Sequence, residues 1–120
     1  MATLALDQLA EAANLDPEFR LAARLWTTTL RLEADQEAHL VRVADGRITG
    51  VEPAGTAEGE ISVRASASEW REFLAPAPRP FYQDLWGAMS HHGFSIDGDL
   101  ESLYAYYPAA QRLFALLRES

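Results

Sequence analysis

The sequence predicts an α+β fold in which a five-stranded, mainly antiparallel sheet is covered by helices. Three observations support this prediction. Apolar residues alternate with polar ones through the middle of the chain, which is typical of half-buried strands. Helical spacings precede and follow that region. The strand segments are joined by short links, which favour antiparallel neighbours, and helices grouped at both ends favour a layered α+β architecture.

Composition limits the size and the class of the protein. The chain has 120 residues, of which 48% are hydrophobic, so we expect one domain over residues 1–120 rather than two independent cores. Arginine supplies all 10 basic residues against 18 acidic ones, and the formal charge of −8 disfavours nucleic acid as a partner. The absence of cysteine excludes disulfides and thiolate chemistry. Because no apolar run approaches the roughly 18–20 residues of a membrane span and no basic signal-like start is present, we expect no membrane span and a cytoplasmic location.

Two helices are expected before the sheet. Apolar residues from Leu4 to Leu15 recur at mixed helical spacings and predict a first amphipathic helix that ends near Asn14. Asp16 and Pro17 then form a helix-start signal, because the carboxylate accepts from free backbone amides while proline needs no amide partner at that position. The second helix should extend to about Arg24.

Four strands follow in close succession. Residues 26–35 alternate strictly, and residues 38–44 form a less regular strand with His39, Val41 and Val43 on one face. Asp45-Gly46 is the dipeptide that a tight hairpin prefers, so the chain should return through residues 47–51. Residues 52–59 contain proline and glycine and should form a loop. Residues 61–65 alternate again and complete the run.

The C-terminal half should alternate helices with one more strand. Ser66 and Glu69 have the capping-box spacing and begin a helix that the prolines at 76, 78 and 80 end. We expect a helix over residues 81–92 closed by Gly93 in a left-handed conformation, and a short strand around Phe94 and Ile96. Asp99 should cap a helix over residues 100–107, and Pro108 should begin a last helix that ends near residue 118.

Few residues have spacings that indicate catalysis. Neither a phosphate-binding glycine loop nor Gly-x-Ser-x-Gly occurs. The adjacent His91 and His92, followed by Asp97 and Asp99, are the densest titratable group. Neighbouring helical side chains point about 100° apart, so we interpret the histidines as a helix-end pair with one ring packed and one solvated, and we expect no metal site and no cofactor. A metal or general-base role is the alternative.

The late helices hold more apolar surface than one packing contact needs. Residues 81–92 present Leu85 and Met89 on one face and add Trp86 on a neighbouring face. Leucine and aromatic stripes continue on the two helices that follow. These side chains either form plain core or line a pocket between the sheet and the helices, with tyrosine hydroxyls as its few polar groups.

Two segments resemble the sterol carrier protein type 2 family. Residues 61–70 (ISVRASASEW) lead a strand into a serine-capped helix, and residues 94–99 (FSIDGD) end a short strand in a Gly-Asp turn that begins the terminal helices. The resemblance implies a sterol-carrier-like sheet and an apolar tunnel for non-catalytic binding or transfer of a sterol, fatty acid or acyl thioester, so that the protein is not an enzyme. The tunnel would be lined by Leu85, Trp86, Met89, Phe94, Leu103, Tyr107 and Leu117. The tryptophan at 70 and the proline-rich stretch depart from the usual pattern and look more like bacterial accessory domains that accompany α/β-hydrolases.

Two other functions stay open at this stage. A small isomerase or lyase of the ketosteroid-isomerase type would use Asp97 or Asp99 as base in an apolar pocket and Tyr104 as the carbonyl-activating hydroxyl. An interaction module would dock Trp86, Tyr106 and the proline-rich stretch on a partner enzyme or on a second copy as a homodimer.

Overall fold

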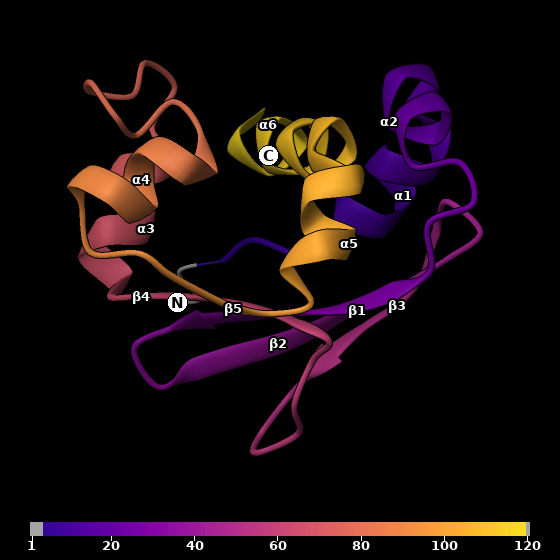
Figure 1. The fold of residues 1–120 in the computed structure, drawn as a ribbon, viewed down its shortest axis with the longest axis horizontal. Coiled ribbons are helices and arrows are strands. Elements are labelled where there is room, and N and C mark those ends of the chain that lie inside the picture. The colour runs from indigo at the N-terminus through magenta and orange to yellow at the C-terminus, as the bar shows by residue number, and fades with distance from the viewer. Residues whose placement is uncertain (1–3, 120) are drawn as a thin grey trace.

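The computed structural model describes residues 4–119, and the order of its elements is the predicted one: two helices, four strands, two helices, one strand and two helices (Figure 1). The elements are α1 (Leu9–Leu15), α2 (Pro17–Ala22), β1 (Thr28–Ala34), β2 (Glu37–Ala44), β3 (Arg47–Pro53), β4 (Ile61–Ala65), α3 (Ala67–Phe73), α4 (Leu85–His91), β5 (Ser95–Gly98), α5 (Leu100–Ala105) and α6 (Tyr107–Glu119). Among these residues no helix is both long and apolar enough to cross a membrane.

The five strands form one mixed sheet in the order β3-β2-β1-β4-β5. Three neighbouring pairs are antiparallel, and β1 and β4 are parallel. The parallel pair arises because the loop of residues 54–60 carries the chain from the β3 edge across to β4. Arg31 holds that loop through bonds from its guanidinium to the carbonyl oxygens of Gly55 and Ala57. The sheet is therefore mainly antiparallel, as predicted.

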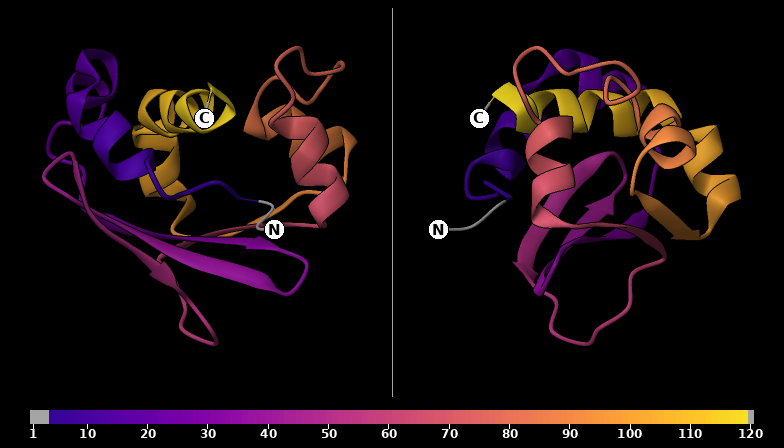
Figure 2. Two further views of the ribbon diagram at one scale, coloured as in Figure 1. Left: turned by 180° about the vertical axis from the view of Figure 1, so that it is seen from behind. Right: turned by 90° about the vertical axis from the view of Figure 1, so that its left-hand side faces the viewer.

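The helices all lie over one face of the sheet, so the core is a single layer between them (Figure 2). β1 shows the alternation that the sequence predicted, with Leu30 and Leu32 buried and the side chains between them half-buried. The register places Leu30 between Val41 and Ile61, so one row of branched side chains runs across three strands. Burying this row against the helices supplies the apolar contribution to folding.

Two predicted boundaries in the first half of the chain differ from the structure. Leu4 and Leu6 are buried, but they precede the helix, which begins only at Leu9. The Leu4 amide donates to a carboxylate oxygen of Glu37 at 3.2 Å instead of to a helical carbonyl. Past the hairpin, β3 extends through Pro53 because that residue still lies opposite His39 on β2, so the loop begins later than expected.

The predicted helix over residues 81–92 is wrong at both ends. Phe81 has a left-handed φ of 68°, and the helix begins at Leu85 because Asp84 caps it with a bond from the Gly87 amide to its Oδ1 at 2.6 Å. At the other end the cap residue is His92 in an extended conformation, and Gly93 has no positive φ.

The helix expected over residues 100–107 ends at Ala105, and the last helix begins one residue before Pro108. Tyr106, between them, has non-helical φ and ψ of −112° and 26°. Its ring stacks on Trp26 with centroids 5.4 Å apart, and this packing accompanies the break between α5 and α6.

Candidate functional site

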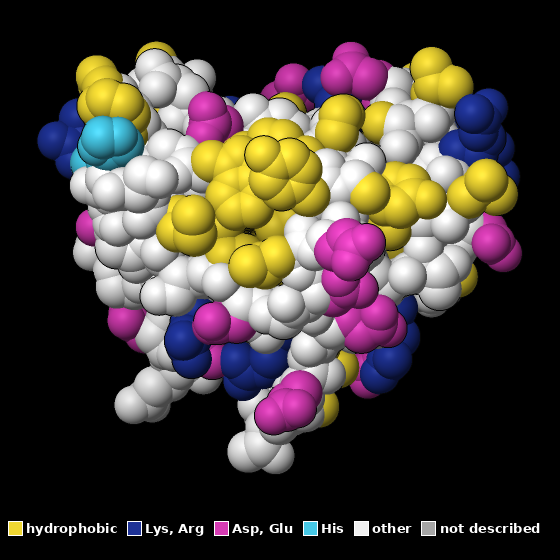
Figure 3. Space-filling model, in the orientation of Figure 1, with side chains coloured by type: hydrophobic (Ala, Val, Ile, Leu, Met, Phe, Trp, Pro, Cys, Tyr) yellow, Lys and Arg dark blue, Asp and Glu magenta, His cyan; other side chains and the backbone are white. Residues whose placement is uncertain are grey.

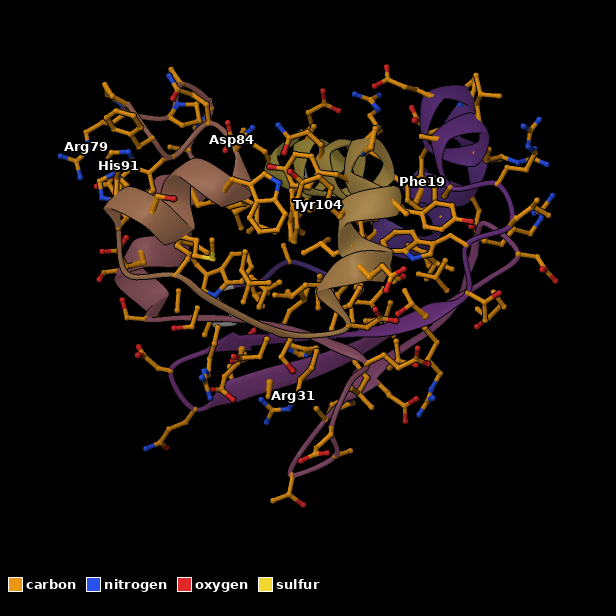
Figure 4. All side chains as sticks on the ribbon, in the orientation of Figure 1. Phe19, Arg31, Arg79, Asp84, His91 and Tyr104 are labelled. Atoms are coloured by element: carbon orange, nitrogen blue, oxygen red, sulfur yellow. The ribbon has the colours of Figure 1, made fainter. Side chains whose placement is uncertain are left out.

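Apolar side chains gather over α4, α5 and the start of α6. Trp86 stacks on Tyr107, with ring centroids 5.3 Å apart, and its ring lies 5.8 Å from that of Tyr104. Met89 follows Trp86 by three residues on α4, and Leu100 precedes Tyr104 by four on α5, so each extends the same helix face. We call these five residues the aromatic patch. Figure 3 shows hydrophobic side chains around a hollow in this region, and Figure 4 places Tyr104 between the two helices.

The aromatic patch is open to solvent. Tyr104 is 75% exposed, Leu100 is 44% exposed and Met89 is 38% exposed, while Trp86 and Tyr107 are half-buried. Large apolar groups at such exposure contribute little to folding, because they stay in contact with water. A contiguous exposed apolar surface of this kind is a common mark of a binding site.

Tyr107 connects the patch to the beginning of α4. The Leu85 and Trp86 amides donate to its hydroxyl oxygen at 3.1 and 3.4 Å, and the Gly87 amide donates to Asp84. The first three amides of α4 thus have side-chain acceptors, which a helix N-terminus requires. Burial is the largest cause that raises the pKa of the Tyr107 phenol above its ordinary value, and the Asp84 charge adds to it.

Four of the seven predicted tunnel residues belong to the buried core. Leu85, Phe94, Leu103 and Leu117 are buried, each with at most 4% of its surface exposed. Phe94 belongs to a cluster of four rings with Trp70, Phe73 and Phe114, and its centroid lies 5.0 Å from that of Trp70. The seven predicted residues therefore divide into four core side chains and three at the surface: Trp86, Met89 and Tyr107.

Leu100 and Tyr104 belong to the apolar stripe that the sequence analysis noted on the helix after residue 99, although neither was among the seven tunnel residues. Asp84 was missed, and its preference for a helix N-cap could have identified it. Tyr106 was expected at an interaction surface, but it is half-buried against Trp26.

The geometry does not meet the needs of the isomerase alternative. Asp99 is exposed and caps α5 by accepting from the Ser102 amide at 3.0 Å. Asp97 is also exposed and pairs with Arg64 at 3.1 Å. Both carboxylates are exposed and have partners other than Tyr104, so the structure does not assemble the apolar base site that the isomerase alternative needs.

The two histidines lie at the end of α4, away from the patch. His92 is half-buried, stacks on Tyr82 at 3.6 Å and lies 3.1 Å from the Pro80 carbonyl oxygen through its Nε2. His91 is exposed and stacks on Phe81 at 3.7 Å. The rings therefore form the helix-end pair that the sequence predicted, with one more packed than the other.

Comparison with known proteins identifies the fold. No family model and no curated protein matches the chain. A solved structure described as sterol carrier protein 2 superposes with a TM-score of 0.77 and 22% identity over 92% of this chain and 91% of that one. A conserved hypothetical protein from Thermus thermophilus, described as possibly sterol carrier protein, has a TM-score of 0.71 and 23% identity over 92% and 82%. A ubiquinone synthesis protein described as UbiJ-SCP2 has a TM-score of 0.61 and 16% identity over 93% and 86%.

Proposed function

We propose that this domain, which has the fold of sterol carrier protein 2, binds an apolar ligand of the sterol or long-acyl class between α4 and α5 and carries it without covalent chemistry. The observation that supports the proposal best is the aromatic patch. It is exposed and surrounds the hollow seen in Figure 3, and on the same two helices Leu85 and Leu103, next to Trp86 and Tyr104 in the chain, are buried. A hydrocarbon that entered here would exchange water for apolar surface on both sides.

The size of the driving force is adequate for reversible binding. Removing about 300 Å² of ligand hydrocarbon from water yields roughly 7 kcal/mol at 25 cal/mol per Å². Association costs consume several kcal/mol of this, so burial of the ligand alone would give only about millimolar binding; a micromolar affinity, about 8 kcal/mol net, requires that apolar protein surface of the patch is removed from water as well. Reversible affinity of that order suits a carrier, because it must also release its ligand.

Entry requires few contacts to be broken. The rings of Trp86 and Tyr104 span the gap between α4 and α5. Such a ring pair is worth about 0.5–1.5 kcal/mol, which is small beside the gain from ligand burial. Rotation of these two side chains would open a path from solvent to Leu85 and Leu103, while the four-ring cluster around Trp70 stays closed.

The test is titration of the purified protein with a fluorescent uncharged lipid, together with native mass spectrometry for a co-purified lipid. We expect saturable binding that Trp86→Ala weakens by roughly 30-fold. Loss of about 80 Å² of half-buried indole corresponds to about 2 kcal/mol. The matched control is Leu21→Ala, because Leu21 is 70% exposed on α2, away from the patch.

Two results would contradict the proposal. Absence of saturable binding by the wild-type protein would remove the carrier function. Equal affinity of the wild type and Trp86→Ala, with an unchanged circular dichroism spectrum, would show that the ligand binds elsewhere.

A further inference from the structure

The chain segment that carries the aromatic patch holds charge of one sign. Residues 80–111, which include α4, β5 and α5, contain four carboxylates and no arginine or lysine. Asp84 lies at the N-terminal end of α4, and Glu101 lies in the first turn of α5, next to Leu100. Figure 3 shows Asp and Glu side chains on two sides of the hydrophobic region, and Figure 4 labels Asp84 beside it. A ligand end at the patch would therefore meet a negative potential.

The ten arginines lie outside the segment of residues 80–111, and most of them already have a polar partner. Six have polar partners: Arg31 with Glu33, Arg42 with Glu52, Arg64 with Asp97, Arg79 with Glu72, Arg112 with Asp16, and Arg118 with the Phe73 carbonyl oxygen. The other four lie on α2, just after it, at the start of β3 and on α3: Arg20, Arg24, Arg47 and Arg71. None of the ten belongs to the two helices that carry Trp86 and Tyr104.

The patch does offer a neutral hydrogen-bond donor. The Tyr107 hydroxyl oxygen accepts two amide N–H groups, but within residues 4–119 its own O–H has no acceptor. A phenol with a free O–H can donate to a hydroxyl, ketone or ester oxygen. Burial first, and then the negative charge of Asp84, raise the pKa of this phenol, so it stays protonated at neutral pH.

We propose that the patch selects apolar ligands whose polar end is uncharged, such as an alcohol, ketone or ester, over ligands that end in a carboxylate or phosphate. This inference rests on the proposed function and narrows it. An anionic end would lose hydration at the patch without gaining a cationic partner, and the carboxylates of Asp84 and Glu101 would repel it. An uncharged end avoids both costs and can accept from Tyr107.

The experiment compares two probes that differ only at the polar end: a long-chain alcohol and the matching carboxylic acid, each with a pyrene at its far end. Both are titrated below their micelle concentrations at neutral pH and low salt. We expect the alcohol to bind at least about tenfold more tightly, and added salt to reduce this ratio because it screens exposed charges. Equal affinities would overturn the charge selection while leaving the carrier function standing, and failure of both probes to bind would overturn both proposals.

Two variants with the same charge change test whether the selectivity for the alcohol arises at the patch. Glu101→Arg should lower the alcohol-to-acid ratio by about three- to tenfold, because it replaces a repulsive charge by an attractive one next to the patch. Glu58→Arg makes the same charge change in the exposed loop of residues 54–60, on the other side of the sheet, and should leave the ratio near the wild-type value. If both variants shift the ratio equally, net charge rather than the patch sets the preference, and the proposal is wrong.

Discussion

Replacing Tyr107 by phenylalanine tests how α4 is held over the sheet. The change removes only the hydroxyl group that accepts from the Leu85 and Trp86 amides, and it keeps the ring that stacks on Trp86. These amides belong to the first turn of α4, where the helix supplies no acceptor of its own. The substitution should therefore loosen the N-terminal turn of α4 without opening a cavity.

The expected magnitude follows from the two distances. The bond at 3.1 Å has normal length, while the one at 3.4 Å is weak, so the pair is worth little more than one good hydrogen bond. A half-exposed helix end can recruit water, which keeps the loss near the low end for an unsatisfied group, at about 1–2 kcal/mol. This corresponds to a fall in the midpoint of thermal unfolding of about 3–8 °C.

Hydrogen exchange followed by nuclear magnetic resonance reads the effect at single amides. Exchange at Leu85 and Trp86 should accelerate by roughly 5- to 30-fold in Tyr107→Phe, since each 1.4 kcal/mol is a factor of ten. Tyr104→Phe is the control, because its hydroxyl makes no hydrogen bond within residues 4–119 and its removal should leave both amides unchanged. Wild-type exchange at Leu85 and Trp86 in Tyr107→Phe would refute the assignment of Tyr107 as the acceptor that holds α4.

Two further predictions concern stability. Hydrogen bonds from Arg112, only partly offset by desolvation, lower the pKa of Asp16 from 3.8 to about 2. The pair should therefore stabilise the fold above about pH 4, and this contribution should be lost as the pH falls toward 2. In urea unfolding, Asp16→Asn should lower the free energy of unfolding by about 1–2 kcal/mol at neutral pH after solvent screening, and by less at about pH 3. Gly98→Ala should lower the free energy of unfolding by about 3 kcal/mol or more, because φ is 103° and a Cβ would lie 2.1 Å from the Glu60 carbonyl oxygen. Gly55→Ala is the control: φ is 56° but the space around it is open, so the loss should be only about 1 kcal/mol. Equal losses in the two variants would contradict the steric argument.

The sheet was predictable because its signals are local. Alternation along β1 identifies its buried face, and Asp45 and Gly46 have the positive φ values of 50° and 76° that their hairpin turn requires. The capping residues were equally readable, since Ser66 and Asp99 each accept from an amide three residues later. At these positions short-range chemistry and the final fold agree.

The beginning of α4 was not predictable in the same way, because two local signals compete and distant contacts decide between them. The apolar spacing from Phe81 onward favours a helix that begins there, and Asp84 favours one that begins at Leu85. Tyr82 donates its hydroxyl to Glu69 at 2.6 Å and its ring stacks on His92, which holds this segment out of a helix. Neither partner is adjacent to Tyr82 in the sequence.

Only part of the candidate site could be predicted from the sequence, again because tertiary contacts decide the rest. The family resemblance indicated Trp86 and Tyr107, which do lie together. Spacing alone could not separate apolar side chains that fill the core from those left outside it. Phe94 is buried in a ring cluster, while Tyr104, which lies in a similar apolar stripe of the sequence, is exposed. The difference depends on where α3 and α6 lie, and tertiary packing rather than periodicity determines that.

The two groups of aromatic rings have opposite consequences for the domain. The cluster around Trp70 is buried, and the indole Nε1 donates to the Glu33 carbonyl oxygen at 2.8 Å, so it fastens α3 to the sheet and leaves no room for a ligand. The aromatic patch joins α4 to α5 and α6 through ring contacts and the Tyr107 hydroxyl, in addition to the buried Leu85 and Ala88 of α4. Since the first group supplies stability and the second leaves Tyr104 in water, the chain can open at the patch without unfolding. Under the proposed function, ligand binding and stability would therefore depend on different side chains, and Trp86→Ala should weaken binding with little cost to stability.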